Sequence, residues 1–291
     1  MILVNLGGGL GNQMFRYAAA WALQKKTGEA LYVSMKGLDS GERAYSLDAF
    51  CLPPVKRCNV ILELFIREYM KLKYILSGLN SDRYDDCIKL FEMGYCKTKR
   101  RQFFRIGEHS FIKFLDGDFQ SEEFFFEYRN EIKTLFRIKD DLSINNQEKL
   151  EHISKISDSV CVHVRLGDYL LERYKRFNVC TKEYYKNAIL KMEEKLDSPV
   201  FFVFSENIDI VKQWNLPGEI RYIEPGETDY EDLQLMKTCK HFIISNSTFS
   251  WWAQYLSANE DKIVIAPNKW FNGEDMNPTC LYMQDWILEE C

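Results

Sequence analysis

The sequence predicts an α/β protein made of two halves, each built on a parallel β-sheet. Short runs rich in β-branched and aromatic residues alternate along the chain with longer helical patterns, which is typical of α/β layers. The chain has 291 residues, and because domains average roughly 100–200 residues, two are expected. We therefore expect two Rossmann-like domains facing a central cleft, with ligands bound beyond the carboxyl ends of the strands.

The first domain is expected to span residues 1–145. Its elements are predicted as a strand at 2–6, a helix at 13–27, a strand at 30–34, a helix near 60–76, a strand at 111–115 and a helix at 122–136. Gly28 stands where a helix commonly ends in a left-handed glycine. The polar segment at 139–147 is predicted to be the linker between the domains.

The second domain is expected to span residues 146–291. Its strands are predicted at 159–164, 200–204, 220–223, 241–245 and 262–266, and its helices at 182–196, 207–214, 229–239, 249–258 and 281–290. We expect the last of these helices to pack back on the first domain.

Composition excludes several classes of protein. The net charge of -5 and pI of about 5.6 argue against general attraction to nucleic acid or to an anionic membrane. No apolar run approaches the roughly 20 residues that span a bilayer, and the N-terminus lacks the basic region of a signal peptide. The nine cysteines form no CxxC pair and the four histidines no ligand pair. We expect a cytoplasmic enzyme with reduced thiols and no metal site.

The first segment that suggests chemistry is the glycine-rich turn at 7–13, between a strand and a helix. Glycines allow positive φ and close approach of a ligand, and the helix start offers N–H groups to an anion. The GxGxxG fingerprint of dinucleotide-binding proteins fails, because Asn12 stands at its last position. The backbone around Gly11 and the amides of Asn12 and Gln13 are therefore candidates for contacts with phosphate or sugar. The alternative is a purely structural turn.

The second segment follows the buried strand at 159–164. Strand alternation places His163 and Arg165 on one face, and the arginine fork suits phosphate. Asp168, after the turn at Gly167, is a candidate carboxylate for the site. The alternative for Arg165 is a salt bridge within the protein.

The third segment is the polar run Ser245-Asn246-Ser247-Thr248, between a strand and a helix. One hydroxyl there is enough to cap the helix, and the others provide hydroxyl and N–H groups for a diphosphate. Asp232 precedes this run by 13 residues and could accept hydrogen bonds from guanine or ribose. A helix cap is the alternative for both features.

Together these segments resemble the bacterial α-1,2-fucosyltransferases of glycosyltransferase family 11. The pieces that carry the resemblance are GGLGNQMFRYAAAWAL at 8–23, FLDGDFQSEEFF at 114–125, HVRLGDY at 163–169, FVFSENIDIVK at 202–212, EDLQLMKTCKHFIISNSTFSWWAQYL at 231–256 and APNKWF at 266–271. They span nearly the whole chain. The resemblance implies a GT-B-like fold and an inverting enzyme that uses GDP-fucose as donor substrate, with no cofactor and no metal. It implies transfer to the 2-hydroxyl of a galactose in an oligosaccharide or lipid-linked glycan, in the cytoplasm or at the inner membrane.

The resemblance also implies residue roles. Arg165 would hold the β-phosphate, Asp232 the guanine, and His163 would orient the nucleotide. The diphosphate would be lined by Ser247, Thr248 and Phe249. Asn12 would lie near the reacting centre.

The chain departs from the family pattern HxRRxD at one position, where Leu166 replaces the second arginine. Alternation points position 166 away from the face of Arg165. This departure leaves a glycan-binding or nucleotide-sugar-binding protein without turnover as the alternative function. Asp168 has two interpretations, as acceptor of the proton from the acceptor hydroxyl or as a brace for Arg165.

Overall fold

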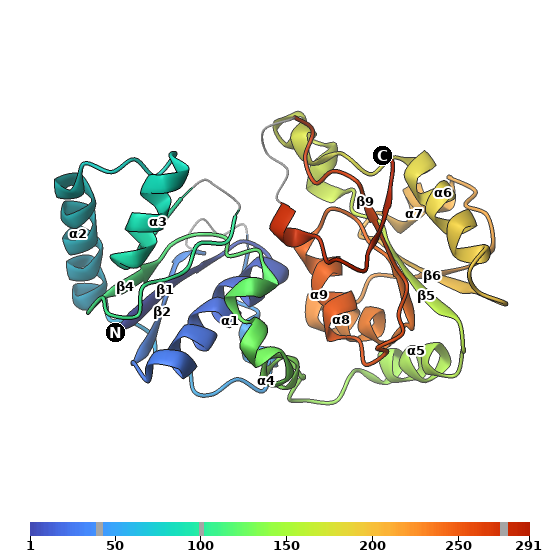
Figure 1. The fold of residues 1–291 in the computed structure, drawn as a ribbon. Coiled ribbons are helices and arrows are strands. Elements are labelled where there is room, and N and C mark those ends of the chain that lie inside the picture. The colour runs from blue at the N-terminus through green and yellow to red at the C-terminus, as the bar shows by residue number, and fades with distance from the viewer. Residues whose placement is uncertain (39–42, 99–101, 274–278) are drawn as a thin grey trace. The chain divides into compact units, whose positions relative to one another are not determined.

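The computed structural model describes residues 1–38, 43–98, 102–273 and 279–291, except for the side chains of Asp168, Leu170 and Thr279. The chain divides into two compact units (Figure 1). The first contains Met1–Lys139 and Pro278–Leu281, and the second contains Asp140–Asn277 and Tyr282–Cys291. The boundary thus falls after Lys139, where the sequence analysis placed it after residue 145.

The first unit is built on a four-stranded sheet in the order β2-β1-β4-β3, and every pairing in it is parallel. Its strands are β1 (Ile2–Gly7), β2 (Leu31–Gly37), β3 (Tyr95–Cys96) and β4 (Lys113–Leu115). All six residues of β1 are buried, as expected for a central strand covered on both faces.

The helices of the first unit are α1 (Leu10–Thr27), α2 (Val60–Ser77), α3 (Tyr84–Glu92) and α4 (Arg129–Leu135), with short 3₁₀ turns at Leu47–Ala49, Glu122–Phe124 and Phe126–Tyr128. Helix α1 ends at Gly28, which has a φ of 70° and so confirms the predicted left-handed cap. The helix predicted at 122–136 is wrong in its first half, since only its last turns are α-helical. Helix α3 was not predicted.

The second unit is built on a six-stranded parallel sheet in the order β10-β9-β8-β5-β6-β7. Its strands are β5 (Ser159–His163), β6 (Val200–Phe204), β7 (Glu219–Ile223), β8 (His241–Ile243), β9 (Val264–Pro267) and β10 (Ile287–Glu289). From β5 the chain first builds toward β7, and then returns to add β8, β9 and β10 on the other side. The strand order therefore reverses between β5 and β8, which is where doubly wound sheets bind ligands.

The helices of the second unit are α5 (Ile144–Ser154), α6 (Lys182–Glu193), α7 (Ile208–Lys212), α8 (Asp229–Thr238) and α9 (Thr248–Leu256), with 3₁₀ turns at Gly167–Leu170 and Glu172–Phe177. Helix α5 was not predicted and begins inside the expected linker. Both α8 and α9 are connected to the strand before them at its carboxyl end, so their N-termini lie at the ligand-binding edge of the sheet.

The end of the chain corrects the sequence analysis. Among the described residues of 281–290 no α-helix forms, and only Leu281 is helical, as the end of the 3₁₀ turn Thr279–Leu281. Instead β10 pairs in parallel with β9 and completes the sheet of the second unit. The run Trp286-Ile287-Leu288 is short and apolar, and such a run does not distinguish strand from helix by its pattern. The open edge of β9 provides the hydrogen-bonding partners that decide it.

Candidate functional site

The polar residues predicted to act together lie at the carboxyl ends of β5 and β8, where the strand order of the second sheet reverses. His163 is the last residue of β5, and Ser245 follows β8. His163 Nδ1 and Ser245 Oγ are hydrogen bonded at 2.9 Å. This bond joins the two strands beside the reversal.

His163 is neutral in this setting. Its side chain is 5% exposed, and burial together with the nearby Arg165 charge lowers the pKa of His163 to about 3. The ring centroid lies 5.7 Å from that of Phe249, in the first turn of α9. His163 therefore acts here as a fixed group that is hydrogen bonded to the segment after β8 and packs on α9, and it carries no charge near neutral pH.

Two buried tyrosines of α6 fix the backbone at the same edge. Tyr185 Oη donates to the carbonyl of His163 at 3.2 Å, and Tyr184 Oη donates to the carbonyl of Ile244 at 2.6 Å. Burial raises the pKa of both phenols, so both remain donors at any physiological pH. Each satisfies a carbonyl just where its strand ends and the ladder of the sheet stops.

The polar run after β8 is used largely within the unit. Ser245 bonds His163, and the Asn246 side chain donates to the carbonyls of Phe177 and Trp270 at 2.8 and 2.9 Å. Ser247 is the N-cap of α9, and its hydroxyl accepts from the N–H of Phe249 at 3.3 Å. The sequence analysis attributed the surplus of polar side chains to a diphosphate, but Ser245, Asn246 and Ser247 use their side chains for contacts within the fold. The start of α9 still presents the positive end of a helix at the switch point.

Arg165 lies just beyond β5 and is held by Glu206, which follows β6. Arg165 Nη1 and Glu206 Oε1 are 2.6 Å apart, and the guanidinium carbon lies 5.3 Å from the ring centroid of Tyr169. The salt bridge that was the alternative reading of Arg165 is therefore present. The pair is partly exposed, at 22% and 35% of the two side chains.

Gly167 and Asn207 connect the same two loops. The N–H of Gly167 donates to Asn207 Oδ1 at 2.7 Å. A Cβ on Gly167 would lie 2.3 Å from Glu206 Oε1, and its φ is +31°. Any other residue at position 167 would displace the carboxylate that holds Arg165.

Neither Glu206 nor Asn207 was predicted as a site residue. Their signal was the polar triplet Ser205-Glu206-Asn207 directly after an apolar strand. That signal is typical of the carboxyl end of a parallel strand, but it became interpretable only once β6 was known to lie beside β5.

Asp232 lies in the first turn of α8 and holds the loop before that helix. Its Oδ1 accepts from the N–H of Gly226 at 3.0 Å. Burial raises the pKa of Asp232, and the charges of Asp229 and Glu231 add to the rise. The N-cap of α8 is Thr228, so Asp232 is not the cap that the alternative interpretation assigned to it.

The glycine turn predicted as a ligand contact lies in the first unit and joins β1 to α1. Gly8 has a φ of +75° and Gly9 is the N-cap of α1. The Gln13 side chain is fully buried and closes the turn, donating to the carbonyls of Gly8 and Ala44 at 2.9 and 2.8 Å. Gln13 therefore has a structural role, in contrast to its interpretation as a ligand contact.

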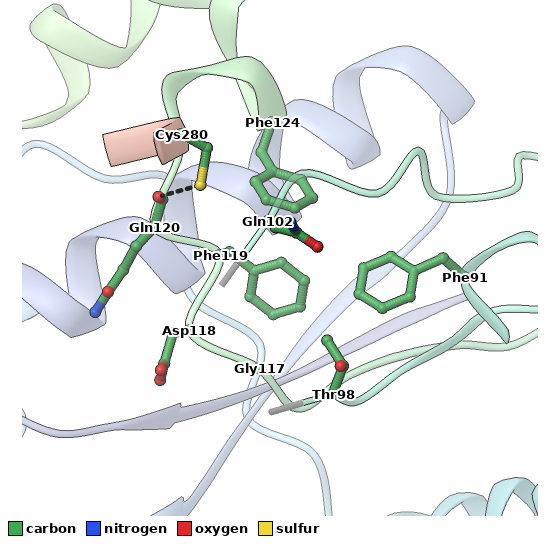
Figure 2. A pocket seen from close by; sticks show the side chains of 9 residues that line it. All are labelled: Phe91, Thr98, Gln102, Gly117, Asp118, Phe119, Gln120, Phe124 and Cys280. Carbon is green, nitrogen blue, oxygen red and sulfur yellow. Dashed lines mark hydrogen bonds between the residues drawn. The ribbon is translucent and has the colours of Figure 1, made fainter. Parts of the chain in front are cut away.

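Asn12 is half-buried, and its Oδ1 accepts from Gln120 Nε2 at 2.9 Å. Gln120 also lines a small pocket of the first unit, which Figure 2 shows with the rings of Phe91, Phe119 and Phe124 turned toward one another. Cys280 Sγ donates to the Gln120 carbonyl at 3.5 Å in the same pocket. Gln120 is thus hydrogen bonded through its backbone to Cys280 and through its side chain to Asn12. Gly11 is buried in the first turn of α1.

A polar network lies at the carboxyl end of β1. Asn5 Nδ2 donates to Asp116 Oδ1 at 2.6 Å, and Arg16 donates to the Asn5 carbonyl at 2.9 Å and to Asp118 at 3.1 Å. Burial alone would raise the pKa of Asp116, but hydrogen bonds from Lys97 and Asn5 outweigh it and the pKa is lowered. The network was not predicted, although the segment FLDGDF at 114–119 contains both Asp116 and Asp118.

Comparison with known proteins identifies the family. A family model described as Glycosyl transferase family 11 matches residues 1–290. The chain belongs to glycosyl transferase family 11. An Escherichia coli alpha-1,2-colitosyltransferase is 30% identical over the whole of this chain and 99% of its own length. Galactoside alpha-(1,2)-fucosyltransferase 1 of Ateles belzebuth is 29% identical over 61% of this chain and 52% of its own length.

This family 11 member also resembles a solved structure, that of an Arabidopsis thaliana FUT1 mutant in complex with GDP. The TM-score is 0.53 at 13% identity, covering 91% of this chain and 70% of that one. The likeness shows a GT-B-like fold with two parallel-sheet α/β units, as expected from the sequence. The protein is a glycosyltransferase.

The position that departs from the family pattern is buried in this glycosyltransferase. Leu166 is 4% exposed and belongs to the core of the second unit, so it points away from Arg165 as expected. The side chain of Asp168 lies outside the described part of the chain. In the described residues no group of three or more His, Cys, Asp or Glu is placed to hold a metal ion. Across the same residues, no helix has the length and apolar character needed to cross a membrane.

Proposed function

We propose that this glycosyltransferase moves L-fucose from GDP-fucose to the 2-hydroxyl of a galactose in a glycan acceptor, with inversion at the fucose C1. The single observation that carries the proposal is the position of Arg165 and the α9 N-terminus at the reversal of the second sheet. A cationic group and a helix N-terminus at this point suit a diphosphate. The family and the printed activities of its relatives support the sugar and the linkage.

Arg165 is the group that would bind the β-phosphate of the donor. The guanidinium has five N–H donors in a planar fork, and its Nη1 pairs with Glu206 Oε1. Such a fork suits bidentate contact with phosphate oxygens. The N-terminal turn of α9, formed by Ser247, Thr248 and Phe249, would line the diphosphate and contribute the positive end of the helix dipole.

Asp232 would recognise the guanine. Its Oδ1 accepts from the Gly226 N–H. The second oxygen can accept from guanine N1–H or N2–H. Adenine and uracil do not present that pair of donors, so a carboxylate here favours the guanine nucleotide.

The reaction follows from these contacts. The galactose 2-hydroxyl attacks the fucose C1, the bond from C1 to the β-phosphate oxygen breaks, and GDP leaves with the electron pair. The proton of the hydroxyl passes to a base, for which Asp168 is the proposed carboxylate, or to water. Arg165 stabilises the negative charge that develops on the leaving phosphate, so we propose that no metal ion is required.

The acceptor and the sugar of the donor are tested together. The enzyme is incubated with GDP-fucose and, in parallel, with GDP-colitose, each with disaccharides that end in galactose. GDP release is measured, and the linkage of the product is determined by NMR. We expect fucose on the galactose 2-hydroxyl. Colitose lacks one hydroxyl of fucose, so preferential use of GDP-colitose would replace the proposed donor while leaving the reaction class intact.

The non-catalytic alternative has a different result in the same experiment. A protein that binds GDP-fucose without releasing GDP in the presence of any galactosylated acceptor would be a binding protein. That outcome contradicts the proposed function.

A further inference from the structure

Helix α2, labelled in the first unit in Figure 1, carries a broad exposed apolar face. The buried side of the helix is narrow and consists of Glu63, Ile66 and Met70. The large apolar residues on the opposite side are 43–83% exposed, and they are Val60, Ile61, Leu64, Phe65, Tyr69, Leu72, Ile75 and Leu76. An apolar surface of this extent on a soluble unit marks an interaction site.

The helix that carries this face is well bounded. Asn59 caps its start, with Oδ1 accepting from the Leu62 N–H at 2.8 Å, and Gly78 ends it with a φ of 66°. Arg67 pairs with Glu63 at 2.7 Å on the inner side. The exposed face is therefore part of a regular, anchored helix and not of a frayed segment.

Two charged side chains are exposed on α2, namely Glu68 and Lys71, and they have opposite signs. A helix that lies on an anionic bilayer has a face rich in Lys and Arg, and Glu68 would have to enter the lipid boundary within the apolar stripe. A second copy of the helix offers Glu68 an opposite charge instead. The charges of Glu68 and Lys71 thus favour a second copy of this helix as the partner.

We infer that the α2 face is the interface of a homodimer in which two copies of α2 pack antiparallel. A two-fold axis that crosses α2 between residues 69 and 70 places Glu68 of one copy opposite Lys71 of the other. The same axis places Leu64 opposite Ile75. The interface is then isologous, with each copy donating and receiving the same contacts, and two ion pairs flank its centre.

The face is small for a stable dimer. Eighteen helical residues extend about 27 Å, and one helix face covers less than the roughly 800 Å² per partner of a standard stable interface. The dimer is therefore weak, and it forms in a concentration-dependent way.

Charge reversal tests the inference on the full chain. Sedimentation velocity is measured from about 1 to 200 µM for the wild type, Glu68→Lys, Lys71→Glu and the double variant with both changes. The wild type is expected to shift from the monomer mass of 34.5 kDa toward twice that value as concentration rises. Each single variant brings like charges together and raises the dissociation constant roughly tenfold or more. The double variant restores the pairs and regains the association of the wild type.

The competing occupant of the face is tested with vesicles that contain phosphatidylglycerol. A wild type that stays monomeric over the whole range contradicts the inference. So does a Glu68→Lys variant that associates as strongly as the wild type. Vesicle binding that Glu68→Lys strengthens, without self-association, would assign the face to a membrane instead.

Discussion

Arg165 and Glu206 form an ion pair of 2.6 Å that links the carboxyl ends of β5 and β6. The glycine at 167 leaves room for that carboxylate, and Asn207 holds the Gly167 N–H from the same loop. The cation proposed to meet the donor phosphate is thus positioned by its neighbouring loop. Its geometry depends on residues that do not themselves contact the substrate.

Glu206→Gln is expected to slow turnover about tenfold, because the amide keeps an acceptor for Arg165 but loses the charge that orients it. Glu206→Ala, which loses both, should be slower still. Since the pair is partly exposed, the melting temperature should change little. Steady-state kinetics with GDP-fucose and circular dichroism measure the two effects.

Glu224→Gln is the matched control for this change. Glu224 also forms an ion pair, with Lys212 at 2.8 Å, but it lies beyond β7 and away from the strand-order reversal. The Glu224→Gln variant should keep the turnover of the wild type. Equal losses in both variants would mean that Glu206 has no special relation to Arg165.

His163 should make the protein sensitive to acid. Its folded pKa of about 3 lies below the ordinary value near 6.5, so between these values the unfolded chain binds a proton that the folded chain does not. The contribution of neutral His163 to the free energy of unfolding is fully present above pH 6.5. It is lost as the pH falls toward 3, by up to about 1.4 kcal/mol per pH unit. His163→Gln should remove this part of the slope. Urea denaturation at several pH values between 4 and 7 measures it.

The slope, and not the absolute stability, is the informative quantity. The variant also loses the bond to Ser245 and is expected to be less stable at pH 7. A slope unchanged by the substitution would show that His163 is not the buried group that titrates.

Asp232→Asn should weaken donor binding more than it slows saturated turnover. The amide oxygen can still accept from the Gly226 N–H, so the loop is expected to persist, while the oxygen proposed to face guanine is replaced by a donor. A charged hydrogen bond contributes about 1.5–3 kcal/mol, so KM for GDP-fucose should rise roughly tenfold or more. The preference for GDP over ADP as inhibitor should fall.

Asp229→Asn, in the same turn of α8, controls for a general loss of charge there. It should keep the base preference of the wild type. If Asp232→Asn lowers the melting temperature and leaves the GDP to ADP ratio unchanged, the residue only supports its loop.

Transfer is expected to persist in excess EDTA. The charge of Arg165 and the dipole of α9 are proposed to take the place of a cation at the leaving phosphate. Rates with and without the chelator should agree. Complete loss that Mg²⁺ or Mn²⁺ restores would show that a metal ion takes part.

The fold was largely predictable because its buried strands are apolar runs. Strand β6 was predicted with its observed bounds, and both sheets are parallel as expected. The end of the chain was not predictable, since only the edge of β9 turns residues 287–289 into a strand. Helix α5 was not predicted because its mixed polar pattern resembles that of a linker. The contact at the start of this helix comes from a segment far along the chain, because the Ser143 N–H donates to the Glu231 carboxylate of α8 at 2.8 Å.

The site was predictable where neighbours in sequence act together and not where distant segments meet. His163 and Arg165 were singled out from one segment, and the structure places His163 at the end of β5 and Arg165 just beyond it. The hydrogen bonds of Asn246 to the carbonyls of Phe177 and Trp270 join three segments that are distant in sequence. No local sequence pattern predicts such bonds. The same holds for Glu206, whose relation to Arg165 depends on the order of strands in the sheet.

The most direct test of the account is the rate of GDP release from GDP-fucose, with a galactosylated acceptor, by Arg165→Ala and Arg165→Lys. Arg173→Ala, an exposed arginine of the neighbouring 3₁₀ turn, is the control. Removal of the Arg165 charge should lower turnover roughly 10²–10³-fold with an unchanged melting temperature. The lysine variant should also be poor, because the fork is lost, while the control keeps the wild-type rate. Near-normal turnover by Arg165→Ala would contradict the assignment of the donor phosphate to Arg165.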